Sequence, residues 1–463
     1  MSEGRFLNGS TRGHVVRMTA TGAFGITFVF LVDAANLLWL SQIGEPRLVA
    51  AIGFAFAIQY FSVSSGIGLM IACTAMVSRS IGQRNREEAR RQAGAAMFFS
   101  VLIQGCVAAF VVLFRHQLVA MAGATGETAT LAARYIAMTV PSLVFMAVGM
   151  TASGVLRADG YGAKAMYITL ISGSVLMVVD PILILGLGWG LDGAAIGLVV
   201  FRMFLMALGL YFAVHQLGLI IWPGRAASFR VFLPFMAIAL PAIATQMATP
   251  VGNYLLTIVM APFGDDAVAA WAVVGRLTVV AFGGIFALAG AIGGIFGQNF
   301  GAGHVDRVRS TYRDAVIFCL IYTAVTWGLL FTATPAIISL FGLSGQGAEV
   351  LRAFTALGVG GFIFVGALFV SNAAFNNLGK PTRSTLLNWG KEAAIGWPAA
   401  VWLAGFFGAS GVIYGQAMAS AMVGTVACLW GWFYVRSLHA GDPEALDLNP
   451  PRPYPNPDRY RRR

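Results

Sequence analysis

Long apolar runs recur along almost the whole chain, and they limit what it can fold into more than any other feature. A helix needs about 20 apolar residues to cross the hydrocarbon of a bilayer. Of the 463 residues, 58% are hydrophobic and only 11% are charged, whereas about one quarter of a soluble domain is charged. The sequence therefore predicts a polytopic membrane protein. The runs lack the polar–apolar alternation of a membrane β-barrel.

The runs are predicted to be helices, because lipid leaves each backbone group to be satisfied within its own segment. A polar lead, 1–15, precedes them and has no small-residue cleavage site, so we interpret it as a retained cytoplasmic segment. The tail, 437–463, is rich in proline and charge and is predicted to be disordered and cytoplasmic. The twelve predicted spans are 16–40, 50–77, 93–114, 130–156, 165–187, 191–214, 233–262, 267–296, 312–334, 350–377, 386–408 and 410–436.

Most of the 30 Lys and Arg residues fall on one side of this topology. Examples are Arg84, Arg86 and Arg90 after the second span, and we count Lys391 with the loop after the tenth. Basic loops face the cytoplasm in membrane proteins, so both termini are predicted to be cytoplasmic. The net charge of +11 is then explained by topology and by anionic membrane lipid. We expect no nucleic-acid partner.

Two polar loops, IGQRNREEARR and FGAGHVDRVRS, look alike. They pair Gly82 with Gly301 and Arg90 with Arg309, each 219 residues apart. The same separation recurs in the loops RADGYGAK and NNLGKPTR. Convergent loop chemistry does not predict a constant separation, so we infer that the chain is internally duplicated.

The duplication divides the chain into two lobes of six helices each, 16–214 and 233–436, with a cytoplasmic linker, 215–232, between them. An even number of spans gives both lobes the same orientation. The predicted fold is therefore an all-α membrane bundle with a pseudo-two-fold axis along the membrane normal. Such a bundle is typical of transporters that work by alternating access.

Several segments are characteristic in their order and spacing. They are VDAANLLWLSQIGEPRLVAAIG, SRSIGQRNREEARR, ASGVLRADGYGAKAM, VVDPILILGLGWGLDGAAIG, GQNFGAGHVDRVR and NNLGKPTRS. From about residue 14 to 436 the chain resembles the multidrug and toxic compound extrusion (MATE) family. The resemblance implies a secondary antiporter of the bacterial inner membrane that exports small lipophilic cations. It implies neither an enzyme nor a cofactor, and a complete pair of lobes favours a monomer in lipid.

Three ionisable residues fall well inside the predicted spans: Asp33, Asp180 and Arg202. Both aspartates should lie in the outer half of one lobe at similar depth. Two nearby carboxylates in low dielectric cannot both ionise cheaply, which favours proton carrying. The alternative is a purely structural aspartate, satisfied by hydroxyls or paired with Arg202. The resemblance implies that the positions of Asp33 and Asp180 couple transport to a cation.

Other residues of the first lobe are accessory candidates. Pro181 kinks its helix and frees a carbonyl that could join the site, or simply makes a packing bend. Arg202 needs a partner: Asp180 is the nearest acid in sequence, and otherwise the arginine snorkels or faces a water-filled cleft. Asn36 lies one helical turn from Asp33 and could add an oxygen ligand.

The coupling ion is predicted to be H⁺ rather than Na⁺. Relatives with a sodium site usually place Asn and Thr where this chain has Leu176 and Leu198, and leucine offers no oxygen. Asn36 keeps a Na⁺-coupled exporter open as an alternative. A lipid-linked oligosaccharide flippase is another, although Arg202 and Arg276 are the only basic candidates for its cavity. No metal site is predicted.

The second lobe has uncharged polar residues in its seventh and tenth spans: Thr249, Asn253, Asn372 and Asn376. These residues either line a substrate path or form hydrogen bonds between helices. The lack of acids in the two spans favours the DinF-like branch of the family over the NorM-like branch.

Overall fold

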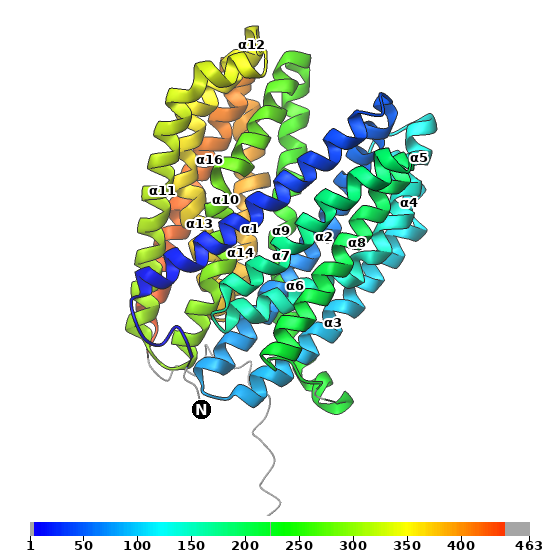
Figure 1. Cartoon of the computed structure of the whole chain (residues 1–463). Helices are drawn as coiled ribbons and strands as arrows, with labels where there is room; N and C mark the ends of the chain where they lie inside the picture. The colour runs from blue at the N-terminus through cyan, green and yellow to red at the C-terminus, as the bar shows by residue number, and fades with distance from the viewer. Residues whose placement is uncertain (1–3, 223, 440–463) are drawn as a thin grey trace, which may run out of the picture.

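The computed structural model describes residues 4–222 and 224–439, and these residues form helices and short connections without a strand (Figure 1). Most of the predicted disordered tail lies outside the described residues. The α-helices are α1 (Thr11–Ser41), α2 (Pro46–Gly82), α3 (Arg86–Leu113), α4 (Arg115–Met121), α5 (Gly126–Thr139), α6 (Leu143–Ala158), α7 (Gly162–Pro181), α8 (Gly190–Leu210), α9 (Arg225–Met260), α10 (Asp265–Gly301), α11 (Val305–Leu340), α12 (Gly345–Ala353), α13 (Phe362–Asn377), α14 (Pro381–Trp389), α15 (Trp397–Phe407) and α16 (Ala409–Ser437). Short 3₁₀ or π segments are η1 (Val140–Ser142), η2 (Ile182–Gly186), η3 (Tyr211–Gln216), η4 (Ala261–Phe263), η5 (Phe354–Gly358), η6 (Val359–Gly361) and η7 (Gly390–Gly396).

Within the described residues, 11 helical segments are long and apolar enough to cross a membrane. They correspond to the predicted spans except for the eleventh, 386–408. That span is divided into α14, η7 and α15, and η7 carries Lys391 and Glu392, both buried. Two predictions are therefore wrong: Lys391 is not a loop residue, and the ionisable residues inside the spans are not limited to Asp33, Asp180 and Arg202. The two side chains neutralise each other, which lets the segment stay within the bundle.

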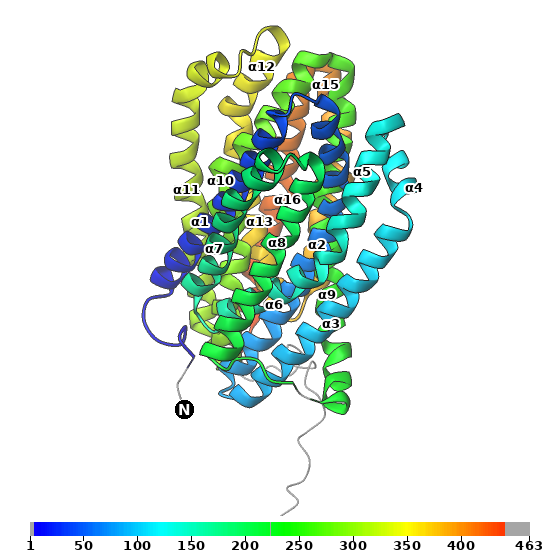
Figure 2. The same ribbon diagram turned by 45° about the vertical axis from the view of Figure 1, so that its right-hand side comes forward.

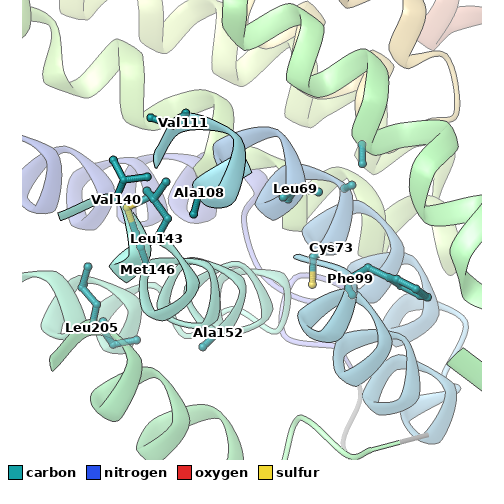
Figure 3. Close-up of a cluster of buried hydrophobic side chains, with 14 of the residues drawn as sticks. Leu69, Cys73, Phe99, Ala108, Val111, Val140, Leu143, Met146, Ala152 and Leu205 are labelled. Carbon is teal, nitrogen blue, oxygen red and sulfur yellow. The ribbon is translucent and has the colours of Figure 1, made fainter. Parts of the chain in front are cut away.

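The buried apolar residues form a large cluster in each half of the chain. The first contains residues from Leu40 to Ala239, and the second contains residues from Leu256 to Leu438 together with Phe6, Val15 and Met18 from the N-terminal end. Figure 3 shows part of the first cluster, where side chains of α2, α3, α6 and α8 gather. Each half thus buries its own core, which agrees with two related lobes.

Two long helices pass from one lobe to the other. α1 contributes Val15 to the core of the second lobe and Leu40 to the core of the first. α9 does the reverse, with Phe235 in the first core and Leu256 in the second. Accordingly, α1 runs obliquely across the molecule in Figure 1. Because α1 and α9 are the first helices of the two repeats, this exchange follows the pseudo-two-fold symmetry.

The lobes meet closely at the end of the bundle that holds the loops 83–85, 159–161 and 302–304, which we call the basic end. There α2 crosses α10 at two glycines. A Cβ on Gly82 would lie 2.1 Å from the carbonyl oxygen of Gln298, and one on Gly301 would lie 2.2 Å from that of Arg79. Residues 79 and 298 are also repeat partners, so the contact is symmetric. Towards the other end, near α12 and α5, the two halves lean apart (Figure 1).

Residues 4–9 also join the lobes at the basic end, although they belong to the lead that was predicted only as a polar extension. Phe6 is 2% exposed, and its N–H donates to Oε1 of Gln298 at 3.0 Å. Nε2 of Gln298 donates to the carbonyl of Ala158 at 2.6 Å. Arg307 donates to the carbonyl of Phe6 at 2.8 Å, while Arg5 lies over the ring of Tyr161 at 3.7 Å. The segment therefore ties the first lobe to the second.

Candidate functional site

A buried carboxylate lies where α1 packs against α7. Asp180, near the end of α7, is 1% exposed. Nδ2 of Asn36 in α1 donates a hydrogen bond of 2.5 Å to Oδ2 of Asp180. The other oxygen, Oδ1, is buried and accepts no hydrogen bond from the described residues. An unsatisfied buried polar atom is rare in a native protein and needs an explanation.

The surroundings of Oδ1 are apolar. A Cβ on Gly197 of α8 would lie 2.0 Å from Oδ1 and 3.1 Å from a methyl carbon of Leu176. Because residue 197 of α8 is a glycine, there is room beside α8 for the carboxylate of Asp180. The wall beside it is aliphatic, so neither Leu176 nor Gly197 brings a side-chain oxygen to Oδ1.

Asp33 lies one helical turn before Asn36 and is half-buried. It is within electrostatic reach of both Asp180 and Arg202. The structure thus brings Asp33, Asn36 and Asp180 together on the contact between α1 and α7. Asp33 retains access to the surface of the bundle, whereas Asp180 is enclosed.

Pro181 lies where α7 ends and a π-helical segment begins. It follows Asp180 directly, and the backbone continues in the π segment η2, where Leu187 N–H donates to the carbonyl of Ile182 at 2.8 Å. Proline has no N–H to donate to the preceding turn. π segments are rare and are frequent at functional sites. The carboxylate therefore lies at a discontinuity of α7, where a small rearrangement of the backbone is least costly.

Arg202 does not pair with Asp180, and this alternative is wrong. The guanidinium, 3% exposed, donates to the carbonyl of Thr139 at 2.8 Å, to Oγ of Ser142 at 3.0 Å and to Oε1 of Gln59 at 3.0 Å. It neither snorkels nor faces an open cleft. Neutral oxygens hold Arg202 inside the first lobe, and no cationic side chain in the described part of the chain pairs with Asp180.

The predicted polar residues of the second lobe separate into two pairs. On α9, Thr249 is half-buried and Asn253 is exposed. On α13, Asn372 and Asn376 are buried, and their Oδ1 atoms accept no hydrogen bond from the described residues. No hydrogen bond joins the two pairs within that part of the chain. The α13 pair presents two unused acceptors inside the second lobe.

Sequence reasoning missed the ion pair in η7. Nζ of Lys391 donates to Oε1 of Glu392 at 2.5 Å. The signal was present in the stretch GKEAAIGWP, where both charges lie inside the predicted eleventh span. Counting Lys391 as a loop residue concealed it. The described residues contain no group of three or more His, Cys, Asp or Glu side chains that could hold a metal ion.

The similarity to known proteins extends over both lobes. The MatE family model matches residues 23–182 and again 241–390, one match in each lobe. The chain is 23% identical to an FAD transporter of Shewanella oneidensis over 90% of this chain and 93% of that protein. It is 20% identical to the multidrug export protein MepA of Staphylococcus aureus, with 85% and 87% covered. The fold superposes on the crystal structure of the Vibrio cholerae MATE transporter VcmN with a TM-score of 0.87, at 22% identity and with 92% and 98% covered.

Proposed function

Because the chain belongs to the MatE family, whose members are transporters and not enzymes, we propose that it exports small lipophilic cations in exchange for protons. In this proposal Asp180 binds the proton, and Asp33 relays it between Asp180 and the surface of the bundle. Asn36 holds Asp180 in place. The basic end faces the cytoplasm of a bacterium, and the protein acts in the plasma membrane.

One observation carries the choice of ion: Oδ1 of Asp180 has no hydrogen-bond donor among the described residues and faces Gly197 and Leu176. A carboxylate in such a place favours its neutral form, so a proton is the simplest ligand. A hard metal cation needs several oxygen ligands, and Leu176 occupies space beside the carboxylate without providing one. Asp180 and Asn36 alone do not make a sodium site.

The mechanism that we propose uses α1 as the connection between the proton and the lobes. α1 begins in the second core, ends in the first, and carries both Asp33 and Asn36. Protonation of Asp180 removes the charge that Asn36 binds and weakens the contact between α1 and α7. A shift of α1 then loosens the closed basic end, so that the lobes open towards the cytoplasm and take up substrate. Release of the proton reverses the change.

The test is efflux of ethidium from proteoliposomes, driven separately by a pH gradient and by a Na⁺ gradient. We expect efflux with the pH gradient alone and its loss in Asp33→Asn and Asp180→Asn. Asp265→Asn, which removes an exposed acid at the start of α10, is the matched control. Efflux driven by Na⁺ would contradict the assignment of the ion, and unchanged efflux in Asp180→Asn would contradict the assignment of the residue.

A second candidate substrate is FAD or a similar phosphorylated planar compound. The full-length relative from Shewanella oneidensis is named an FAD transporter. In this chain Nη1 of Arg157 lies 3.1 Å from the place of a Cβ on Gly290, so the guanidinium points across from the first lobe to α10 of the second. A cation between the lobes could hold a phosphate. Export of FAD by the same proteoliposomes, lost in Arg157→Gln, would favour this substrate over cations.

A further inference from the structure

A buried pair of opposite charges lies in the second lobe, on a different helix from Asp180. The side chains of Lys391 and Glu392 are only 10% and 8% exposed. Charged residues inside a membrane bundle are costly and by default mark a functional site. Replacement of a buried ion pair by apolar residues is often neutral or stabilising. The stability of the fold therefore does not explain why this pair is present.

The ion pair joins neighbours in the sequence, and this makes it easy to open. Consecutive residues on a helix do not face each other. Nζ of Lys391 reaches Oε1 of Glu392 at 2.5 Å because the lysine stem is long and flexible. Rotation of that stem alone separates the charges, and no helix has to move. Among the described residues, Lys391 is the one hydrogen-bonding partner of the carboxylate.

The other face of the carboxylate lies against α9. A Cβ on Gly252 would lie 2.3 Å from Oε2 of Glu392, so any larger residue there would displace the carboxylate. Tyr60 of α2 is 37% exposed and within electrostatic reach of Glu392. Because α2 packs along α9, Glu392 lies at the junction of the two lobes. It is on the α2–α9 side of that junction, whereas Asp180 is on the α1–α7 side.

The two carboxylates lie on equivalent segments of the repeat but at different positions, because the counterpart of Asp180 is Ala399 and that of Glu392 is Gly173. The separation of 219 residues makes α14, η7 and α15 the equivalent of α7 and η2. Asp180 precedes one π segment and Glu392 lies within the other. In each lobe a glycine of a neighbouring helix makes room for the carboxylate, Gly197 for Asp180 and Gly252 for Glu392. The difference is the partner, which is a neutral amide for Asp180 and an ammonium for Glu392.

We infer that Glu392 is a second binding site, for a monovalent organic cation, and that Lys391 is an internal competitor that occupies the carboxylate until the ligand displaces it. The carboxylate already holds one cation, and its neighbours are a tyrosine and the glycine backbone of α9, which suit a lipophilic cation. The flexible stem lets the displaced ammonium turn towards water. The class of ligand rests on the proposed function, but the site does not depend on Asp180.

The test is equilibrium binding of tetraphenylphosphonium to the purified full-length protein at one fixed, mildly alkaline pH. We expect Glu392→Gln to raise the Kd about tenfold or more, the effect of one lost charge contact of about 1.4 kcal/mol. Lys391→Gln should lower the Kd, because the competitor is gone. The double variant should behave like Glu392→Gln, and it leaves no unpaired buried charge, so it serves even if a single variant does not fold.

The controls separate this site from the proposed function. Glu349→Gln removes an exposed acid of the same lobe and should leave the Kd unchanged. In the Asp33→Asn/Asp180→Asn background the effect of Glu392→Gln should persist, even if proton-driven efflux is lost or was never present. Unchanged binding in Glu392→Gln, or an equal loss in Lys391→Gln and Glu392→Gln, would show that the pair is only structural and would overturn the inference.

Discussion

Asn36 and Asp180 are 144 residues apart in sequence, and a hydrogen bond of 2.5 Å joins them. The bond is accepted by Oδ2 of Asp180, whereas Oδ1 has no partner among the described residues. It connects the carboxylate to α1, the helix shared by both lobes. Asn36 therefore does more than neighbour Asp33 along α1: in the proposed mechanism it links the charge state of Asp180 to the position of α1.

Asn36→Leu removes the donor while keeping the size of the side chain. A hydrogen bond to a charged group contributes about 1.5–3 kcal/mol, so we expect proton-driven efflux to fall about tenfold or more. The measurement is the initial rate of ethidium efflux from proteoliposomes at a fixed pH gradient. Gln42→Leu, at an exposed position just after α1, is the control. Equal rates in the two variants would mean that Asn36 does not act on Asp180.

Gly197→Ala tests the space around the carboxylate. The added methyl would lie 2.0 Å from Oδ1 of Asp180, so either the carboxylate or α8 must move. Overpacking of this kind costs about 1–3 kcal/mol, and we expect a lower melting temperature in detergent together with loss of efflux. In contrast, Gly105→Ala has nothing within 4 Å of the new methyl and should be tolerated. A Gly197→Ala protein with full activity would show that Asp180 need not hold this position.

The two-lobe fold could be predicted, because long apolar runs, basic loops and a constant repeat separation can be recognised in the sequence alone. The partner of Arg202 could not. Its partners Gln59, Thr139 and Ser142 come from two separate spans, and nothing in the sequence distinguishes them from other buried polar residues. Distance along the chain favoured Asp180, but packing of the helices decided otherwise.

The position of Phe6 was also beyond the sequence. Two adjacent apolar residues, Phe6 and Leu7, among Arg5, Asn8 and Gly9 form no periodic pattern, so the lead looks like any polar extension. Its burial depends on Gln298, which is almost 300 residues away. For Lys391 and Glu392 the residues were visible, and the error lay in assigning Lys391 to a loop.

Phe6→Ala should weaken the closure of the basic end. A buried Phe replaced by Ala costs about 3–5 kcal/mol in a core, and here the cost falls on the state in which the lobes are joined. We therefore expect faster hydrogen exchange of the amides in 4–9 and at the end of α10. The lipid-facing Phe24, 60% exposed, provides the control as Phe24→Ala. No change of exchange in Phe6→Ala would show that the segment does not hold the lobes together.

Asp159, in the loop after α6, gives a prediction about pH. Burial raises the pKa of this carboxyl above its ordinary value of 3.8, although Arg86, at 3.0 Å, acts in the opposite direction. Because the pKa of Asp159 is higher in the folded state than in the unfolded state, the folded protein binds this proton more tightly. The fold therefore gains stability from this group as the pH falls through the folded-state pKa towards 3.8, and it loses that stability as the pH rises. Asp159→Asn should remove that part of the pH dependence. We compare the melting temperature of the variant with that of the natural protein at each pH. The variant's melting temperature minus that of the natural protein should be larger at neutral pH than near pH 3.8. A difference that does not change with pH would contradict the prediction.

Gly82 and Gly301 test whether the symmetric contact is the closed gate of the proposed cycle. A methyl group on either would lie about 2 Å from a backbone carbonyl of the opposite lobe, and a backbone carbonyl cannot turn away as a side chain can. Both Gly82→Ala and Gly301→Ala should therefore separate the lobes at the basic end, and the pseudo-two-fold relation predicts similar effects. Spin labels in the loops 83–85 and 302–304 should report a longer distance in each variant and an unchanged distance in Gly105→Ala. Efflux should fall in both, because the lobes then cannot close the basic end while substrate leaves at the other end. An unchanged label distance would mean that the helices slide to accommodate the methyl group and that this crossing does not set the closed state.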